Sequence, residues 1–164
     1  MKEIRDDPEG GPSVARSSSD PNFWTGPTSL SPDQVKAMPR DPDALLRTFS
    51  GVTNADSAAE PDTNRVIDAA SALLGSGLAD ADLQALTYRA LERLPGLTVD
   101  EHASDIDGRA GVAIGAKVSN GLQRIDLIID PTTGRFLGRT ETNLIATGGA
   151  PAGNIEEASA VYTR

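Results

Sequence analysis

The sequence predicts an α+β fold, in which three to four helices (residues 31–95) pack on one face of an antiparallel sheet of about four to five strands (residues 97–163). Two observations predict this fold. Apolar residues recur at helical spacing up to residue 95 and at a spacing of two after residue 96. The segments after residue 96 are joined by turns too short for parallel crossovers, so neighbouring strands should run antiparallel.

Residues 1–30 are predicted to be a disordered or loosely attached N-terminal arm, and residues 31–164 a single α+β domain. The arm is rich in Gly, Pro and Ser and offers little to bury. Its exception is Phe23-Trp24, which holds the only tryptophan. Two interpretations stay open: these rings anchor the arm on the domain, or they contact a partner, because Trp is enriched at binding hot spots.

Each predicted helix begins at a capping signal. Ser31-Pro32-Asp33-Gln34 is a capping box with Pro at the first helical position, and Pro39 ends this short helix. Asp41-Pro42-Asp43 begins a second helix, which Gly51 ends.

The two longer helices follow the same logic. The third runs from Asp62-Thr63 to Gly75, and the fourth begins at Asp80 or Asp82 and ends before Pro95. Apolar residues at helical spacing predict the faces that these four helices bury. They are Leu45, Leu46, Phe49, Val66, Ile67, Ala70, Leu73, Leu74, Leu83, Leu86, Ala90, Leu91 and Leu94.

The clearest strand signal is a β-hairpin over Arg124–Glu141. Ile125, Leu127 and Ile129 share one face of its first strand. In the turn Asp130-Pro-Thr-Thr-Gly134, Asp bonds its own backbone, Pro presets φ, and Gly tolerates a left-handed conformation.

Further strands are predicted on either side of the hairpin. Residues 97–103 and 110–118 form two strands joined by a turn at 105–108, and Ser119-Asn-Gly121 leads into the hairpin. Residues 146–154 are expected to form a mobile loop, and residues 159–163 a last edge strand.

The composition argues against several classes of function. A net charge of −9 disfavours binding to nucleic acid or to an anionic membrane. The absence of cysteine excludes disulfides, thiolate metal sites and cysteine nucleophiles. No apolar run is long enough for a transmembrane helix, and the N-terminus lacks the apolar stretch of a signal peptide. We therefore expect a cytosolic chain, or one whose anchor lies outside this sequence.

No catalytic or cofactor-binding constellation has good spacing. The lone His102 lies beside Glu101 in a predicted strand, where neighbouring side chains point to opposite faces. Carboxylates gather near two turns without the spacing of a calcium loop, and no pair of them is placed in an apolar cleft as glycoside hydrolysis requires. They are Asp100, Glu101, Asp105, Asp107 and Asp130. The glycines of residues 111–117 lack the Walker pattern.

Two features suggest binding. Four arginines are expected along the solvent side of the sheet, where they recognise an anionic group or simply pair with neighbouring carboxylates; they are Arg109, Arg124, Arg135 and Arg139. The small residues Ala113, Gly115 and Ala116 leave room for an apolar cleft between sheet and helices.

Three segments together resemble the C-terminal half of an actinobacterial family of uncharacterised, membrane-anchored extracytoplasmic proteins, often encoded beside sigma factors. The segments are residues 41–46, residues 88–99 and residues 127–138, and the resemblance spans roughly residues 38–145. It implies an extracytoplasmic α+β domain, similar to lipoprotein carriers and periplasmic anti-sigma regulators, and it supplies no known catalytic residues to carry over. The chain lacks the family's membrane helix and its earlier strands, which would leave a sheet edge open to pairing with a second chain.

Three functional hypotheses follow. The first is a non-enzymatic extracytoplasmic interaction or sensory domain in envelope or sigma-factor signalling, which binds a protein partner or a second copy of itself. The second is a carrier of a lipid or other apolar small molecule. The third is a hydrolase of unrecognised geometry. The residues expected to contact a ligand or partner are Phe23, Trp24, Arg124 and Arg139.

Overall fold

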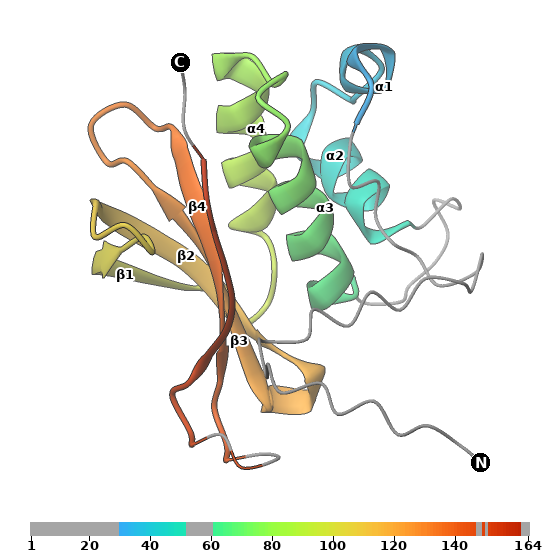
Figure 1. Ribbon diagram of the computed structural model, residues 1–164. Coiled ribbons are helices and arrows are strands. Elements are labelled where there is room, and N and C mark those ends of the chain that lie inside the picture. The colour runs from blue at the N-terminus through green and yellow to red at the C-terminus, as the bar shows by residue number, and fades with distance from the viewer. Residues whose placement is uncertain (1–29, 52–60, 147–148, 150, 162–164) are drawn as a thin grey trace, which may run out of the picture.

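The computed structural model describes residues 30–51, 61–146, 149 and 151–161. Within them, four helices precede a five-stranded antiparallel sheet, which confirms the predicted α+β class. The helices are α1 (Pro32–Lys36), α2 (Pro42–Ser50), α3 (Thr63–Gly75) and α4 (Ala81–Leu91). The strands are β1 (Thr98–Ser104), β2 (Ala110–Val118), β3 (Gln123–Ile129), β4 (Phe136–Asn143) and β5 (Ile155–Ala160), with a short 3₁₀ turn η1 (Ser119–Gly121). Figure 1 shows the helices gathered on one side of the sheet.

The predicted capping residues begin the helices. Ser31 and Gln34 form the reciprocal capping box of α1. The carboxylates of Asp41 and Asp62 accept backbone N–H groups in the first turns of α2 and α3. Of the two candidates for α4, Asp80 is the cap, because its carboxylate accepts the N–H of Leu83.

The strands lie in chain order, β1-β2-β3-β4-β5, so that β1 and β5 are the edges of the sheet. The β3–β4 turn forms as predicted: Asp130 accepts the N–H groups of Thr132 and Thr133, and Gly134 takes a φ of +71°. Phe136 stands opposite Ile129 and begins the return strand.

The last strand corrects one prediction, because β5 spans Ile155–Ala160 rather than residues 159–163. Two backbone hydrogen bonds close the β4–β5 connection: the N–H of Asn143 donates to the Asn154 carbonyl, and the N–H of Gly153 donates to the Asn143 carbonyl. Strand pairing therefore begins directly after Asn154. The sequence did not indicate that the strand begins at Ile155, because Glu156 and Glu157 follow and Glu is depleted in strands. Residues 147, 148, 150, 162 and 163 lie outside the described residues.

The hydrophobic core lies between the helices and the inner face of the sheet. The helices contribute the predicted residues Leu45, Phe49, Val66, Ile67, Leu73, Leu83 and Leu91, all of them buried. The sheet contributes Ala116, Val118, Ile125, Leu127 and Phe136. Residues that stand opposite one another in register share a face, so Arg139 and Glu141, the partners of Leu127 and Ile125, also face the helices.

Candidate functional site

The four residues predicted to contact a ligand or partner do not form one site in the structure. Phe23 and Trp24 lie outside the described residues. Arg124 stands opposite Lys117 and Thr142 on the open face of the sheet, whereas Arg139 faces the helices. The expectation that all four arginines line the solvent side is therefore wrong for Arg139, because its position in the register sets its face.

On the open face, Arg124 makes a bidentate ion pair within its own strand. Its Nε and Nη2 donate to the Asp126 carboxylate at 2.9 and 2.6 Å, and its Nη1 donates to the Thr98 hydroxyl at 2.7 Å. Residues two apart on a strand share a face, which brings Arg124 and Asp126 together. The Asp126 carboxylate occupies the space above Gly115, where a Cβ would lie only 2.1 Å from its Oδ1. The guanidinium is therefore already engaged and is no open anion site.

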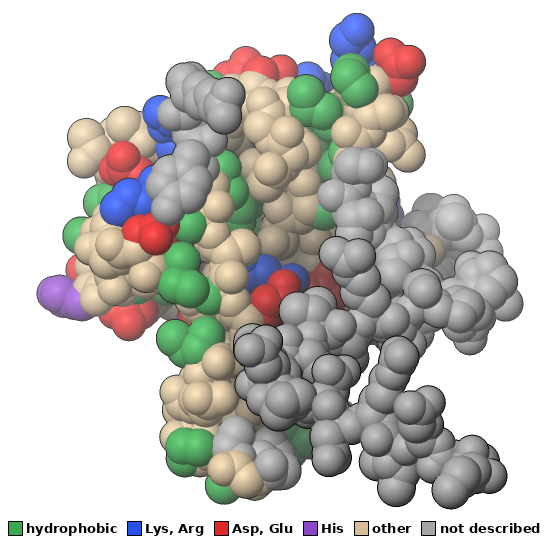
Figure 2. All heavy atoms as spheres, in the orientation of Figure 1, with side chains coloured by type: hydrophobic (Ala, Val, Ile, Leu, Met, Phe, Trp, Pro, Cys, Tyr) green, Lys and Arg blue, Asp and Glu red, His purple; other side chains and the backbone are tan. Residues whose placement is uncertain are grey.

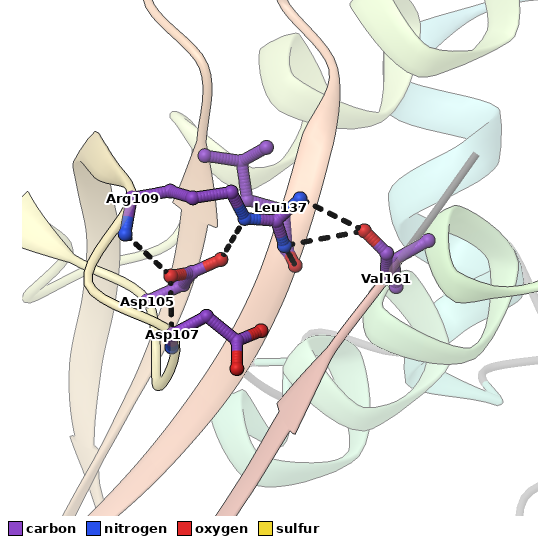
Figure 3. Close-up of polar contacts among 5 residues, drawn as sticks. All are labelled: Asp105, Asp107, Arg109, Leu137 and Val161. Carbon is purple, nitrogen blue, oxygen red and sulfur yellow. Dashed lines mark hydrogen bonds and ion pairs between the residues drawn. The ribbon is translucent and has the colours of Figure 1, made fainter. Parts of the chain in front are cut away.

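Arg109 bridges the ends of three strands (Figure 3). Its Nε donates to the Asp105 carboxylate, whose side chain is fully buried. Its Nη2 donates to the carbonyls of Leu137 at 3.1 Å and Val161 at 3.2 Å, and its Nη1 also reaches the Val161 carbonyl. The turn between β1 and β2 thus holds the start of β4 and the end of β5. We call this arrangement the Arg109 clamp.

The hydrogen bonds of the Arg109 clamp mark it as a structural contact. Burial acts to raise the pKa of Asp105, but the N–H and guanidinium of Arg109 outweigh burial and hold that pKa below its ordinary range. Sequence reasoning placed Asp105 in a turn and Arg109 on a strand face. It missed the Arg109 clamp because the carbonyl acceptors of Leu137 and Val161 lie 28 and 52 residues from Arg109.

Arg139 is the centre of a second cluster, where α3 covers β4. Its Nη2 lies 3.1 Å from Oδ1 of Asp68 on α3 and 3.0 Å from Oε2 of Glu141. The contact with Asp68 is an ion pair without hydrogen-bond geometry. Oδ1 of Asp68 and Nε of Arg139 are buried, and neither has a hydrogen-bond partner among the described residues. We call Asp68, Arg139 and Glu141 the Arg139 triad; unlike the Arg109 clamp, it is incompletely satisfied.

Another arginine-lined feature lies on the outer side of the helix layer. A hollow of about 410 Å³, open to solvent, is lined by Arg40, Asp82, Ala85, Leu86 and Arg89. Arg40 is engaged at 2.9 Å with the Asp80 carboxylate, which already caps α4. The side-chain hydrogen bond from Arg40 lowers the pKa of Asp80. Arg40 therefore ties the segment between α1 and α2 to the start of α4 and is not a vacant cation in this hollow.

Tyr88 also has a structural contact that its sequence position did not indicate. It lies on α4, away from the predicted apolar stripe, and its hydroxyl donates to the Gly134 carbonyl at 2.9 Å. Burial raises the pKa of Tyr88 to about 12. The contact ties α4 to the turn of the β3–β4 hairpin.

The carboxylates that lie near the turns have separate roles. Asp105 belongs to the Arg109 clamp, and Asp130 accepts the N–H groups of its own turn, which lower its pKa. Within the described residues, no group of three or more His, Asp or Glu side chains is close enough to hold a metal ion. His102 is exposed on β1. None of the described helices is long and apolar enough to cross a membrane.

The small residues predicted to open a cleft are divided between the two faces. Ala116 lies in the core between sheet and helices. Ala113 and Gly115 alternate with it and so point to the open face, where Asp126 fills the space above Gly115.

The β1 edge is the most exposed part of the sheet. Val99 is 60 % exposed, although its partner in the register is the half-buried Ile114, next to the half-buried Val112. Asp100 and Glu101 follow Val99 along the strand; Asp100, opposite Ala113, points to the open face, and a bulge interrupts the pairing between Asp100 and Ala103. We call Val99, Asp100, Glu101, Val112 and Ile114 the β1 surface. It combines an apolar strip, two carboxylates and the outer edge of a strand.

The comparisons with known proteins identify no relative: no family model, no curated protein and no solved structure matches this chain.

Proposed function

We propose that this chain is a non-enzymatic interaction domain that binds a basic, extended segment of a protein partner along β1. One observation carries the proposal: within the described part of the chain, β1 pairs with β2 alone, so its outer backbone groups face no further strand. Extended segments add to such edges through main-chain hydrogen bonds, and side-chain contacts then give specificity.

The charge and shape of the β1 surface support a basic segment. Asp100 and Glu101 supply negative charge beside the exposed Val99, in a chain whose net charge is −9. Opposite charges directly across a strand pair stabilise it, and like charges destabilise it. The other edge strand, β5, carries Glu156 and Glu157. Pairing of two copies through their edges would therefore set carboxylates against carboxylates, which favours a different protein over a homodimer.

The proposal includes extracytoplasmic placement and a role in envelope or sigma-factor signalling. The resemblance of residues 38–145 to a membrane-anchored family is what supports this part. The carrier of an apolar molecule has less support, because the small residues expected to open a cleft lie on both faces of the sheet. Native mass spectrometry followed by denaturation tests the carrier directly, since a bound lipid would appear as mass lost on denaturation.

The proposed function is tested by NMR titration of the ¹⁵N-labelled chain with a short peptide of alternating Lys and Val. We expect amide shift changes concentrated in β1 and β2, weakened by added salt because exposed charges are screened. A peptide of alternating Glu and Val serves as the matched ligand control and should cause no such changes.

Two variants with the same change of charge separate the β1 surface from the rest of the molecule. Glu101→Lys should weaken binding of the basic peptide at least several-fold. Glu92→Lys, at the exposed C-terminal end of α4, should leave it unchanged. Shift changes that cluster away from β1, or an equal loss of binding in both variants, would contradict the proposal.

A further inference from the structure

The Arg139 triad joins two layers of the fold through one cation. Asp68 comes from α3, whereas Arg139 and Glu141 come from β4, and both carboxylates approach the same Nη2 atom. The side chains of Arg139 and Glu141 are each 17 % exposed and that of Asp68 is 38 % exposed. In Figure 2, basic and acidic side chains meet in the hollow between the sheet and the helix layer.

The charges around the triad do not balance. Glu157 of β5 stands directly opposite Glu141 in the register, and like charges in that position repel. Glu156, also of β5, and Asp62, the cap of α3, add further negative charge. Helix α3 itself contributes one basic residue, Arg65, whose Nη1 donates a hydrogen bond to the Ser50 carbonyl.

Glu156 differs from the other carboxylates of this group because its hydrogen bonds are satisfied. It accepts from the side-chain amides of Gln123 and Asn143. Asp68 and Glu141 therefore share one guanidinium while Glu157 adds a third negative charge opposite Glu141, and Oδ1 of Asp68 is buried without a hydrogen bond. A proton on one of these carboxyl groups would relieve the repulsion and supply a donor to a neighbouring oxygen.

We infer that the contact of α3 and β5 with β4 is a proton-dependent lock, which is closed in mild acid and loosens as the carboxyl groups of Asp68 and Glu141 ionise beside the negative charge of Glu157. The geometry places the opening at the N-terminal half of β5, because the Arg109 clamp holds the other end at Val161. The lock acts on the edge opposite the β1 surface and does not depend on the proposed partner.

The direction of the pH dependence follows from the environment of each carboxyl group. Burial raises the pKa of Asp68 above its ordinary 3.8, and Arg139 offsets this only in part. Burial likewise raises the pKa of Glu141 above 4.5, with added repulsion from Glu157 and Asp68. A group whose folded pKa is raised stabilises the fold below its ordinary pKa, and this contribution is lost as the pH rises through the raised value.

Amide hydrogen exchange tests the lock, with each rate divided by the intrinsic rate at the same pH. From about pH 4.5 to about pH 7, protection of β5 and of the first turns of α3 should fall, while β2 and β3 keep theirs. Each unit by which a folded pKa is raised allows up to about a tenfold change in the opening equilibrium.

Glu157→Gln is the decisive variant, because Glu157 is exposed and its substitution leaves the Arg139 triad intact. It should raise the protection of β5 at neutral pH several-fold and flatten its pH dependence. Asp68→Asn should also flatten the pH dependence of the protection of β5. The control is Glu101→Gln on β1, which removes the same charge and should behave as wild type.

Carboxyl-carbon NMR gives a second readout. The pKa of Glu141 should lie above its ordinary value in the wild type and move down towards it in Glu157→Gln. The inference is overturned if that pKa is ordinary in the wild type, if the protection of β5 is independent of pH, or if Glu101→Gln flattens the profile as much as Glu157→Gln.

Discussion

Single residues of this protein are fixed either by local chemistry or by close approach of a distant segment. The turn at Asp130–Gly134 belongs to the first kind, because its hydrogen bonds and its positive φ lie within a few neighbouring residues. Gly115 belongs to the second kind. The sequence shows only a glycine in a strand, whereas in the structure the Asp126 carboxylate and the Ile125 carbonyl occupy the position of a Cβ.

Gly115→Ala is therefore expected to destabilise the fold by about 1–3 kcal/mol, the usual cost of overpacking. Its Cβ would lie 2.1 Å from Oδ1 of Asp126 and 2.3 Å from the Ile125 carbonyl oxygen, and the second of these is backbone that cannot move freely. Urea denaturation followed by circular dichroism measures the change. A loss below a few tenths of a kcal/mol would show that the sheet adjusts easily.

Gly75→Ala is the matched control at a glycine with room. Gly75 is the last residue of α3, its φ is not positive, and the nearest atom to its Cβ position is an edge carbon of Phe136 at 3.7 Å. That is an ordinary contact, so alanine should stabilise the fold by up to about 1 kcal/mol through its higher helix propensity. The two substitutions add the same methyl group and should have opposite signs.

At the scale of elements, β5 depends on two contacts outside its own pairing with β4. The Arg109 clamp holds its C-terminal end, and the carboxylates of the Arg139 triad lie beside its N-terminal half. Neither contact is local in sequence. Strand β5 was therefore only partly predicted, and its neighbours decide where it begins and how firmly it is held.

Arg109→Met should destabilise the protein by about 3 kcal/mol, because it leaves the Asp105 carboxylate buried without its cation. The double variant Asp105→Asn/Arg109→Met should be less destabilised than the sum of the two single variants, since no uncompensated charge remains. Thermal denaturation measures stability, and hydrogen exchange of the backbone amide at Val161, which donates to the Leu137 carbonyl, measures the release of β5.

An additive double variant, or unchanged exchange at Val161 in Arg109→Met, would mean that the Arg109 clamp contributes little to holding β5.

At the scale of the whole molecule, buried and capping carboxylates fall into two groups with opposite pH dependence. Hydrogen bonds from N–H groups and from Arg109 lower the pKa of Asp105 and of Asp130. Burial raises the pKa of Asp68 and of Glu141. Both groups act on one cooperative fold with a net charge of −9, so their effects add in the free energy of unfolding.

The free energy of unfolding should therefore be largest in mild acid and decrease towards neutrality. Groups with lowered pKa stabilise the fold above their ordinary value of 3.8, and this stability is lost as the pH falls through their folded pKa. Groups with raised pKa stabilise it at low pH and lose this effect as the pH rises. Urea denaturation at constant ionic strength across pH checks the profile.

Glu141→Gln should flatten the decline towards neutrality and leave the acid side unchanged. A maximum at or above neutral pH in the wild type would contradict the assignment of the two groups.

Local sequence signals were enough to predict the order of the elements, the caps of the helices, the β3–β4 turn and the apolar residues of the core. These features depend on local hydrogen bonds, backbone preferences and periodicity, which neighbouring residues specify. Four features emerged only in the folded chain: Arg139 faces the helices, Arg109 clamps β5, Asp126 fills the space above Gly115, and β1 carries the most exposed edge. Each of these depends on strand register or on contacts between residues far apart in the chain, because a shift of one residue moves every side chain of a strand to the other face.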